Sequence, residues 1–182
     1  ALMQKFGVKK GMFYNCAGLT NVIIPEGVTE IIFDAFANCT SLREVKLPES
    51  LRTIDEGAFS GCSALEAIEL GKNVNMINMY AFAYCTSLRE VTIPEGIYAN
   101  CLGWDLFRNC TALEKVYVPR GISYIGFNGC SSLREIVYGG TVAEWWEITV
   151  YDDDFHGTAL ERITCTDGVI TDIPYETEMP EY

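Results

Sequence analysis

Apolar and polar positions recur along this chain with a period of 23 residues. In each unit a Leu is followed three residues later by an aliphatic residue and, two positions further, by another, with polar residues between them. Alternation of this kind is typical of a short β-strand with one buried face. A second aliphatic pair, spaced by three residues, comes after a Pro or Gly. A fixed period of this length predicts a solenoid whose units stack on one another, because one unit cannot bury its own apolar side.

Two columns of residues mark the repeat most clearly. One consists of Cys, with a Phe three residues before each: Phe13 and Cys16, Phe36 and Cys39, Phe59 and Cys62, Phe82 and Cys85, Phe107 and Cys110, Phe127 and Cys130. The first four Cys are 23 residues apart, and the last two intervals are 25 and 20. We expect the six Phe to form a continuous structural spine, with each Cys filling a corner of its rung as a small apolar residue. The irregular intervals predict a bulge near residues 97–106 and a shortened unit at 125–127.

The remaining positions predict how each unit turns. Pro after the first aliphatic pair removes a backbone donor where the strand should end. The segment Asp34–Ala37 and its equivalents are expected to form a brief helical turn. The pattern thus predicts an α/β repeat with a narrow parallel sheet on one side and short helical turns or loops on the other. We expect a repeat array of about six rungs over residues 1–138, with an incomplete first rung, and a C-terminal cap and tail over 139–182.

The unit Ala-Phe-x-x-Cys-x-x-Leu-x-x-Val-x-Ile-Pro-x-x-Val-x-x-Ile resembles the BspA-like class of bacterial leucine-rich repeats, a surface-protein group with a 23-residue period. The resemblance covers about residues 8–138, and the segment 138–168 is similar to the ending that often closes such arrays. It implies a right-handed leucine-rich-repeat solenoid. It also implies a non-catalytic cell-surface or secreted module for adhesion or ligand binding. No ligand follows from it.

The net charge of the chain disfavours some classes of binding partner. The 182 residues carry 13 Lys plus Arg against 25 Asp plus Glu, a formal net charge of −12. Nucleic-acid binding and anionic membranes are disfavoured, because both require basic residues. No run approaches the roughly 18 apolar residues of a membrane span, and the first residues lack the apolar core of a signal peptide. The pattern begins partway through a unit at Val8, so we expect a monomer or a fragment of a longer chain, located outside the cell or on its surface.

Candidate chemistry is sparse. No pair of Cys has the close spacing of a zinc site, so we expect neither metal nor cofactor. Disulfides stay open as an alternative to free thiols, with Cys101 and Cys165 the first candidates because they lie outside the Cys column. His156 follows the acidic run Asp152–Asp154, where a weak cation site is the alternative to a solvated loop. We expect no enzyme activity, which would need a pocket between Trp145–Trp146 and Trp104.

The outward positions of the strands are the candidate binding surface. The residue after each Leu alternates in charge from Arg43 onward and is expected to fix register: Thr20, Arg43, Glu66, Arg89, Glu114 and Arg134. The next outward columns vary in character, as a binding surface can, and supply the candidate ligand-binding residues: Glu44, Lys46, Glu69, Glu90, Thr92, Lys115 and Tyr117. The acidic residues at the centre of these columns predict a basic or polar partner. We expect a protein or glycan ligand at the cell exterior, with extracellular-matrix components among the candidates. Further candidate anchors are Tyr98, Tyr124 and Met76.

Size limits this hypothesis. Six rungs about 4.8 Å apart, with strands about 15 Å long, give a face of roughly 400 Å². An ordinary stable interface uses about 800 Å² per partner. The face therefore needs additional rungs or many copies on one surface. The alternative function is a structural spacer in a larger wall or surface protein, with no ligand of its own.

Overall fold

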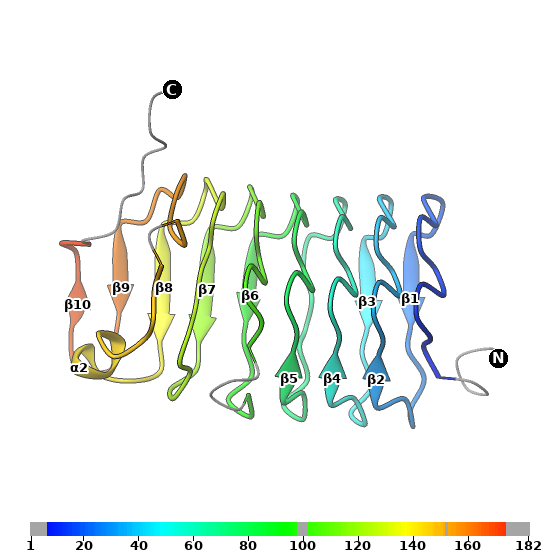
Figure 1. The fold of residues 1–182 in the computed structure, drawn as a ribbon, viewed down its shortest axis with the longest axis horizontal. Helices are drawn as coiled ribbons and strands as arrows, with labels where there is room; N and C mark the ends of the chain where they lie inside the picture. The colour runs from blue at the N-terminus through cyan, green and yellow to red at the C-terminus, as the bar shows by residue number, and fades with distance from the viewer. Residues whose placement is uncertain (1–6, 98–101, 152, 174–182) are drawn as a thin grey trace.

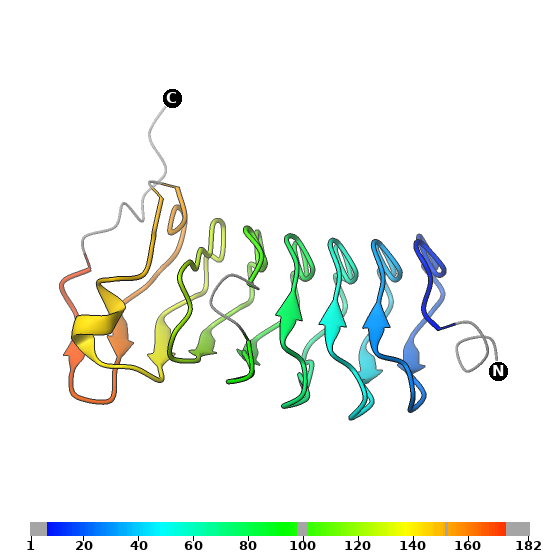
Figure 2. The same cartoon turned by 60° about the horizontal axis from the view of Figure 1, so that its bottom comes forward.

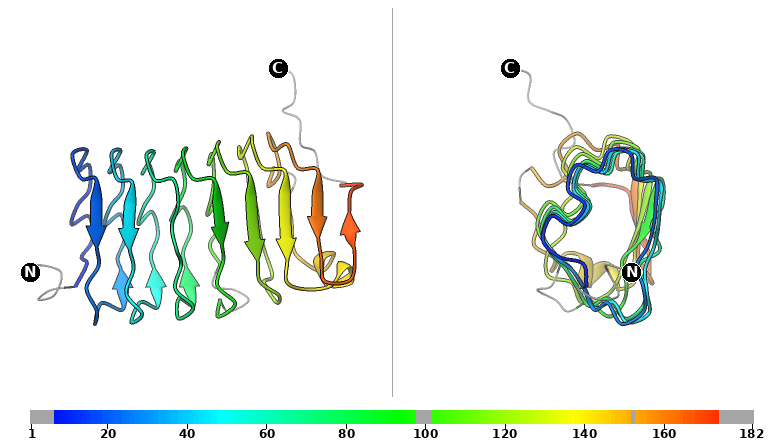
Figure 3. Two further views of the ribbon diagram at one scale, coloured as in Figure 1. Left: turned by 180° about the vertical axis from the view of Figure 1, so that it is seen from behind. Right: turned by 90° about the vertical axis from the view of Figure 1, so that its right-hand side faces the viewer.

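Successive repeats form the turns of an elongated coil, with each turn beside the next (Figure 1). This computed structural model describes residues 7–97, 102–151 and 153–173. Seen along the long axis, the turns superimpose as one closed outline, and the chain winds around a core that runs the length of the molecule (Figure 3). The sequence prediction of a solenoid is confirmed.

One side of the coil carries the strands that follow a Leu of the repeat, together with the last strand of the C-terminal hairpin. They are β1 (Asn21–Ile23), β3 (Glu44–Lys46), β6 (Glu90–Thr92), β7 (Lys115–Val118), β8 (Glu135–Tyr138), β9 (Arg162–Thr164) and β10 (Val169–Ile170). Pairing is parallel from β6 to β9 and between β1 and β3, whereas β10 pairs antiparallel with β9. Residue Ala67 of the intervening turn forms an isolated parallel bridge to Glu90. We call this side, with the 67–69 turn, the front face.

The second aliphatic pair of each unit forms another parallel sheet, which the sequence pattern did not predict. It contains β2 (Glu30–Ile31), β4 (Thr53–Ile54) and β5 (Met76–Ile77). Isolated bridges extend it to Val8 at one end and Leu102 at the other. We call it the back sheet. Its strands run opposite in direction to the parallel strands of the front face, as expected for a chain that winds around a core (Figures 1 and 2).

The segment Asp34–Ala37, predicted as a brief helical turn, forms a turn in which the Ala37 amide donates to the Asp34 carbonyl at 3.1 Å, but it does not extend into a helix. Asp34 and Asn38 both have left-handed backbone, with φ of 54° and 59°, and a right-handed helix cannot continue through such residues. The amides of Phe36 and Asn38 instead donate to Ala58 and Ser60 of the next turn at 2.8 and 2.7 Å. Hydrogen bonds between rungs thus alternate with hydrogen bonds inside the turn. In the described residues the α-helical part is confined to α2 (Val142–Trp145).

Stacked rings run through the core beside a column of thiols. The centroids of successive Phe rings, from Phe13 to Phe127, are 5.0, 5.3, 5.5, 5.8 and 6.1 Å apart, with interplanar angles of 14° or less. Each buried Cys of the repeat column donates its S–H to the carbonyl of a Phe in the preceding rung, as Cys62 does to Phe36 at 3.2 Å. The same bond recurs at Cys39, Cys85, Cys110 and Cys130. A residue there must be small, apolar and able to donate, and Cys is all three.

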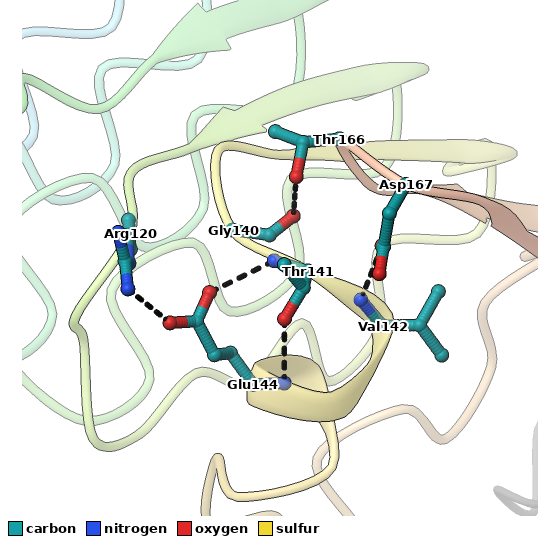
Figure 4. A network of polar contacts seen from close by, with 7 residues as sticks. All are labelled: Arg120, Gly140, Thr141, Val142, Glu144, Thr166 and Asp167. Carbon is teal, nitrogen blue, oxygen red and sulfur yellow. Dashed lines mark hydrogen bonds and ion pairs between the residues drawn. The ribbon is translucent and has the colours of Figure 1, made fainter.

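The C-terminal end of the coil is closed by α2 and the β9–β10 hairpin (Figure 4). Thr141 and Glu144 form a reciprocal capping box at the start of α2, and Arg120 of the preceding turn pairs with Glu144. Asp167, in the hairpin, accepts the amide of Val142 at 2.8 Å. Trp145 is fully buried under this arrangement. Because β9 pairs in parallel with β8, the front face runs on past residue 138, and the division of the chain there stays a prediction.

Candidate functional site

The front face presents two outward columns above a buried one. In β3, Val45 points into the core while Glu44 and Lys46 on either side are exposed. The register places Glu44 beside Asn21 and aligns Glu90 with Lys115 and Glu135. The seven candidate binding residues therefore lie on one surface, where local charge pairing separates them into three groups.

Glu44 and Lys46 form the first group. Their side chains meet at 3.3 Å between Lys46 Nζ and Glu44 Oε1, and more than half of each side chain is exposed. An exposed ion pair of this kind is weak and easily exchanged for a ligand group. Both residues stay accessible to a partner.

Lys115 and Tyr117 belong to a second group that is tied into a network. Glu135 is the centre of this network. Its carboxylate accepts hydrogen bonds from Arg162 Nε and Nη2 at 3.0 and 3.2 Å, and it forms an ion pair with Lys115 Nζ at 3.1 Å. Hydrogen bonding from Arg162 and the neighbouring Lys115 charge lower the pKa of Glu135 to about 2. Lys115 Nζ also lies 4.9 Å from the centre of the Tyr117 ring. Paired charges make this end of the face rigid. The role of Arg162 was missed because it stands beyond the regular repeats.

Glu69, Glu90 and Thr92 form the third group, and they line one hollow. Its other lining residues are the apolar or small Ala67, Ile68, Leu70 and Val91, and its volume is about 470 Å³. The 67–69 turn meets β6 through the single bridge at Ala67 rather than through a full strand. The hollow is thus a break in the sheet at the middle of the front face, with two carboxylates and a hydroxyl on an apolar floor.

The charged residues of alternating sign that precede each strand form ion pairs between neighbouring rungs. Arg43 meets Glu66 at 3.7 Å, and Arg89 meets Glu114 at 3.2 Å. The series continues beyond the prediction, because Arg134 pairs with Glu161. All of these side chains are more than half exposed, so they contribute to register rather than much to stability.

The other candidates lie elsewhere. Met76 is in β5 of the back sheet, and Tyr124 bridges to Thr149 on the same side. Trp104 does not meet the Trp145–Trp146 pair in the pocket considered for an enzyme, because Trp145 packs against the Tyr138 ring at 5.4 Å inside the coil. Tyr98, Cys101 and Asp152 lie outside the described residues.

Cysteines and acids give little reactive chemistry. The seven described Cys are free thiols, and burial raises the pKa of Cys62 and Cys110 to about 12. Burial also raises the pKa of Cys165. Within residues 7–97, 102–151 and 153–173, no three His, Cys, Asp or Glu side chains gather closely enough to hold a metal ion. Over the same residues no helix has the length and apolar character needed to cross a bilayer.

Comparison with known proteins gives a family match over most of the chain. The model of the BspA type leucine rich repeat region matches in six copies, over residues 7–134 and 102–176. Among curated proteins there is no match.

Solved structures with the same fold come from several bacteria. A leucine-rich repeat protein of T. pallidum is 28% identical with a TM-score of 0.66, over 77% of this chain and 70% of that one. One from Bacteroides ovatus is 28% identical with a TM-score of 0.69, over 84% and 45%. A leucine rich cell surface protein of Faecalibacterium prausnitzii is 35% identical with a TM-score of 0.65, over 71% and 34%. The matched region thus spans less than half of the length of the last two.

Proposed function

The chain belongs to the BspA type leucine-rich repeat family, and we propose that it is a non-catalytic interaction module that captures a protein or glycan ligand through its front face. We further propose that it acts outside the cell or on its surface. The Faecalibacterium relative, 35% identical over 71% of this chain, is a cell surface protein, which supports that location.

The hollow at the centre of the front face carries the proposal. Its apolar floor reaches solvent at the exposed Ala67 and the half-buried Leu70. Both lie beside the carboxylates of Glu69 and Glu90, which line the same hollow. A long basic or amide-bearing side chain of a partner can place its alkyl part on this floor and its polar end near the carboxylates. The exposed Glu44 and Lys46 on one flank and Tyr117 on the other extend the contact.

Charge favours such a partner over the whole face. The net charge of −12 attracts basic surfaces and speeds their association. The face remains small compared with the roughly 800 Å² of an ordinary stable interface. We therefore expect weak binding by one copy and strong capture when many copies are displayed together.

The test is capture by the chain multimerised on beads, against a panel of extracellular-matrix proteins, mucins and glycans. The test variant carries Glu44→Lys, Glu69→Lys and Glu90→Lys. The matched control carries the same three-charge reversal at exposed sites outside the front-face columns: Glu30→Lys, Glu95→Lys and Glu147→Lys. Circular dichroism establishes that both variants fold.

We expect the native chain and the control to capture the same panel members and the test variant to lose them. Equal loss in both variants would show that capture depends on net charge alone. Equal capture by the native chain and both variants would show that the front face is not the binding site. Capture of nothing by any of them would favour the spacer alternative.

A further inference from the structure

Three aromatic side chains gather on the side of the coil opposite the front face, near its C-terminal end. Trp104 follows Leu102, which bridges to β5 of the back sheet. Tyr124 bridges to Thr149, two residues before Tyr151. The first two positions fall in the units whose lengths depart from 23 residues, and the third lies beyond the last Cys of the repeat.

The rings form a shallow bowl. Their centroids are 5.8 Å apart for Trp104 and Tyr124, and 5.7 Å apart for each of the pairs that involve Tyr151. The rings are tilted by 44° to 53° relative to one another. With Asp105, Asp153 and Asp154 they line a hollow of about 350 Å³. We call these six residues the aromatic bowl.

The base of the aromatic bowl is held in place by a buried carboxylate. Asp154 is 5% exposed. Its two carboxylate oxygens accept hydrogen bonds, one from the Tyr124 hydroxyl and one from the Tyr151 backbone amide, each at 2.6 Å. Gly126 makes room for this arrangement, because a Cβ there would lie 2.5 Å from Asp154 Oδ1 and 2.7 Å from the Tyr124 hydroxyl oxygen. The Tyr124 hydroxyl and the Tyr151 backbone are therefore held in place before any ligand arrives.

Two aromatic residues at the rim of the aromatic bowl are exposed. Trp104 is 58% and Tyr151 50% exposed, so both rings face water although their burial would be favourable. Three carboxylates surround them, and only Asp105 is neutralised, by Arg108 at 3.0 Å. The local charge is negative, which repels anions. Aromatic faces attract cations through the ring quadrupole, and most strongly those that lose little hydration, such as alkylated ammonium groups.

We propose that the aromatic bowl binds an alkylammonium group, with the cation against Trp104 and Tyr151 and its charge balanced by Asp153 and Asp154. A bare metal ion does not fit, because the rings supply no oxygen ligands and the described acids do not converge on one point. Such a group occurs in free choline-type molecules and in lysine side chains of partner proteins. This site is separate from the front face, and its test is independent of the proposed function.

Isothermal titration with four probes at constant ionic strength tests the inference. They are choline, its uncharged isostere 3,3-dimethyl-1-butanol, Nα-acetyl-lysine amide and the trimethylated form of that amide. The variants are Trp104→Ala and Asp153→Asn, with Trp146→Ala as the control because Trp146 is 47% exposed but outside the aromatic bowl. Thermal unfolding establishes that each variant is folded.

We expect saturable binding of at least one ammonium probe and at least tenfold weaker binding of the uncharged isostere. Trp104→Ala should lower the affinity for the bound ammonium probe at least tenfold, and Asp153→Asn should lower it about threefold. Trp146→Ala should leave this affinity unchanged. Preference for choline would identify a free small cation as the source, and preference for a lysine probe a partner side chain. Equal binding of the isostere, binding unchanged by Trp104→Ala, or no binding of any ammonium probe would overturn the proposal.

Discussion

Removing the ring of Phe59, at the centre of the Phe stack, is expected to destabilise the coil by about 4 kcal/mol. The ring is fully buried and stacks on Phe36 at 5.3 Å and on Phe82 at 5.5 Å. Truncating a buried Phe to Ala costs about 3 to 5 kcal/mol, and each lost ring pair adds about 0.5 to 1.5 kcal/mol beyond burial. Both neighbours of Phe59 lose a partner, which places Phe59→Ala near the middle of the range of about 3 to 5 kcal/mol rather than at its lower end.

Phe13→Ala is the matched comparison. Its ring is only half-buried and stacks on Phe36 alone within the described residues, at 5.0 Å. We expect a loss of about 2 kcal/mol, half that at Phe59. Urea unfolding followed by circular dichroism measures both, with the slope compared between variants to detect rungs that unfold separately. Equal losses at the two positions would refute the argument that stacking between neighbours stabilises the coil.

Three further predictions concern single sites. Glu135→Gln should lower the free energy of unfolding at pH 7 by about 1 to 2 kcal/mol after solvent screening of the exposed Arg162. The folded pKa of Glu135, about 2, lies below its ordinary 4.5. The difference from native should therefore persist above pH 4.5 and shrink as the pH falls toward 2; a pH-independent difference would contradict this. Tyr84→Asn should stabilise the folded chain by about 0.5 to 1 kcal/mol, measured by urea unfolding, because Tyr84 has φ of 60° and Asn tolerates left-handed backbone better. The control Tyr14→Asn, at a residue whose φ is not positive, should not stabilise it. The thiols of Cys62 and Cys110, whose pKa values burial raises to about 12, should react with Ellman's reagent at pH 8 only after unfolding, and rapid reaction in the native state would refute their burial.

The sequence sufficed for the features that repeat. Phe and Cys columns at one spacing predict one stacked core, and the alternation around Val45 and Val116 predicts which strand positions point inward. Those predictions rest on side-chain periodicity, which a regular coil reproduces in every rung.

Other features depended on backbone geometry or on contacts across irregular rungs. The left-handed residues that keep the turn from extending into a helix include those that stand two residues before a Phe, but these differ in residue type, as Asp34 and Tyr80 do. The spacing of Val28 and Ile31 fits a helix as well as the turn into a strand, so the back sheet was missed. The aromatic bowl brings together Trp104 and Tyr151 from units that break the period, where no column predicts a neighbour.

The central claim is that the front face is where a ligand binds. Hydrogen–deuterium exchange of the native chain, with and without the panel member it captures most strongly, tests this directly. We predict slower exchange in peptides that contain residues 67–70 and 90–92, with unchanged exchange in the back-sheet strands 53–54 and 76–77. Protection confined to the back sheet or to the helix 142–145 would contradict the account.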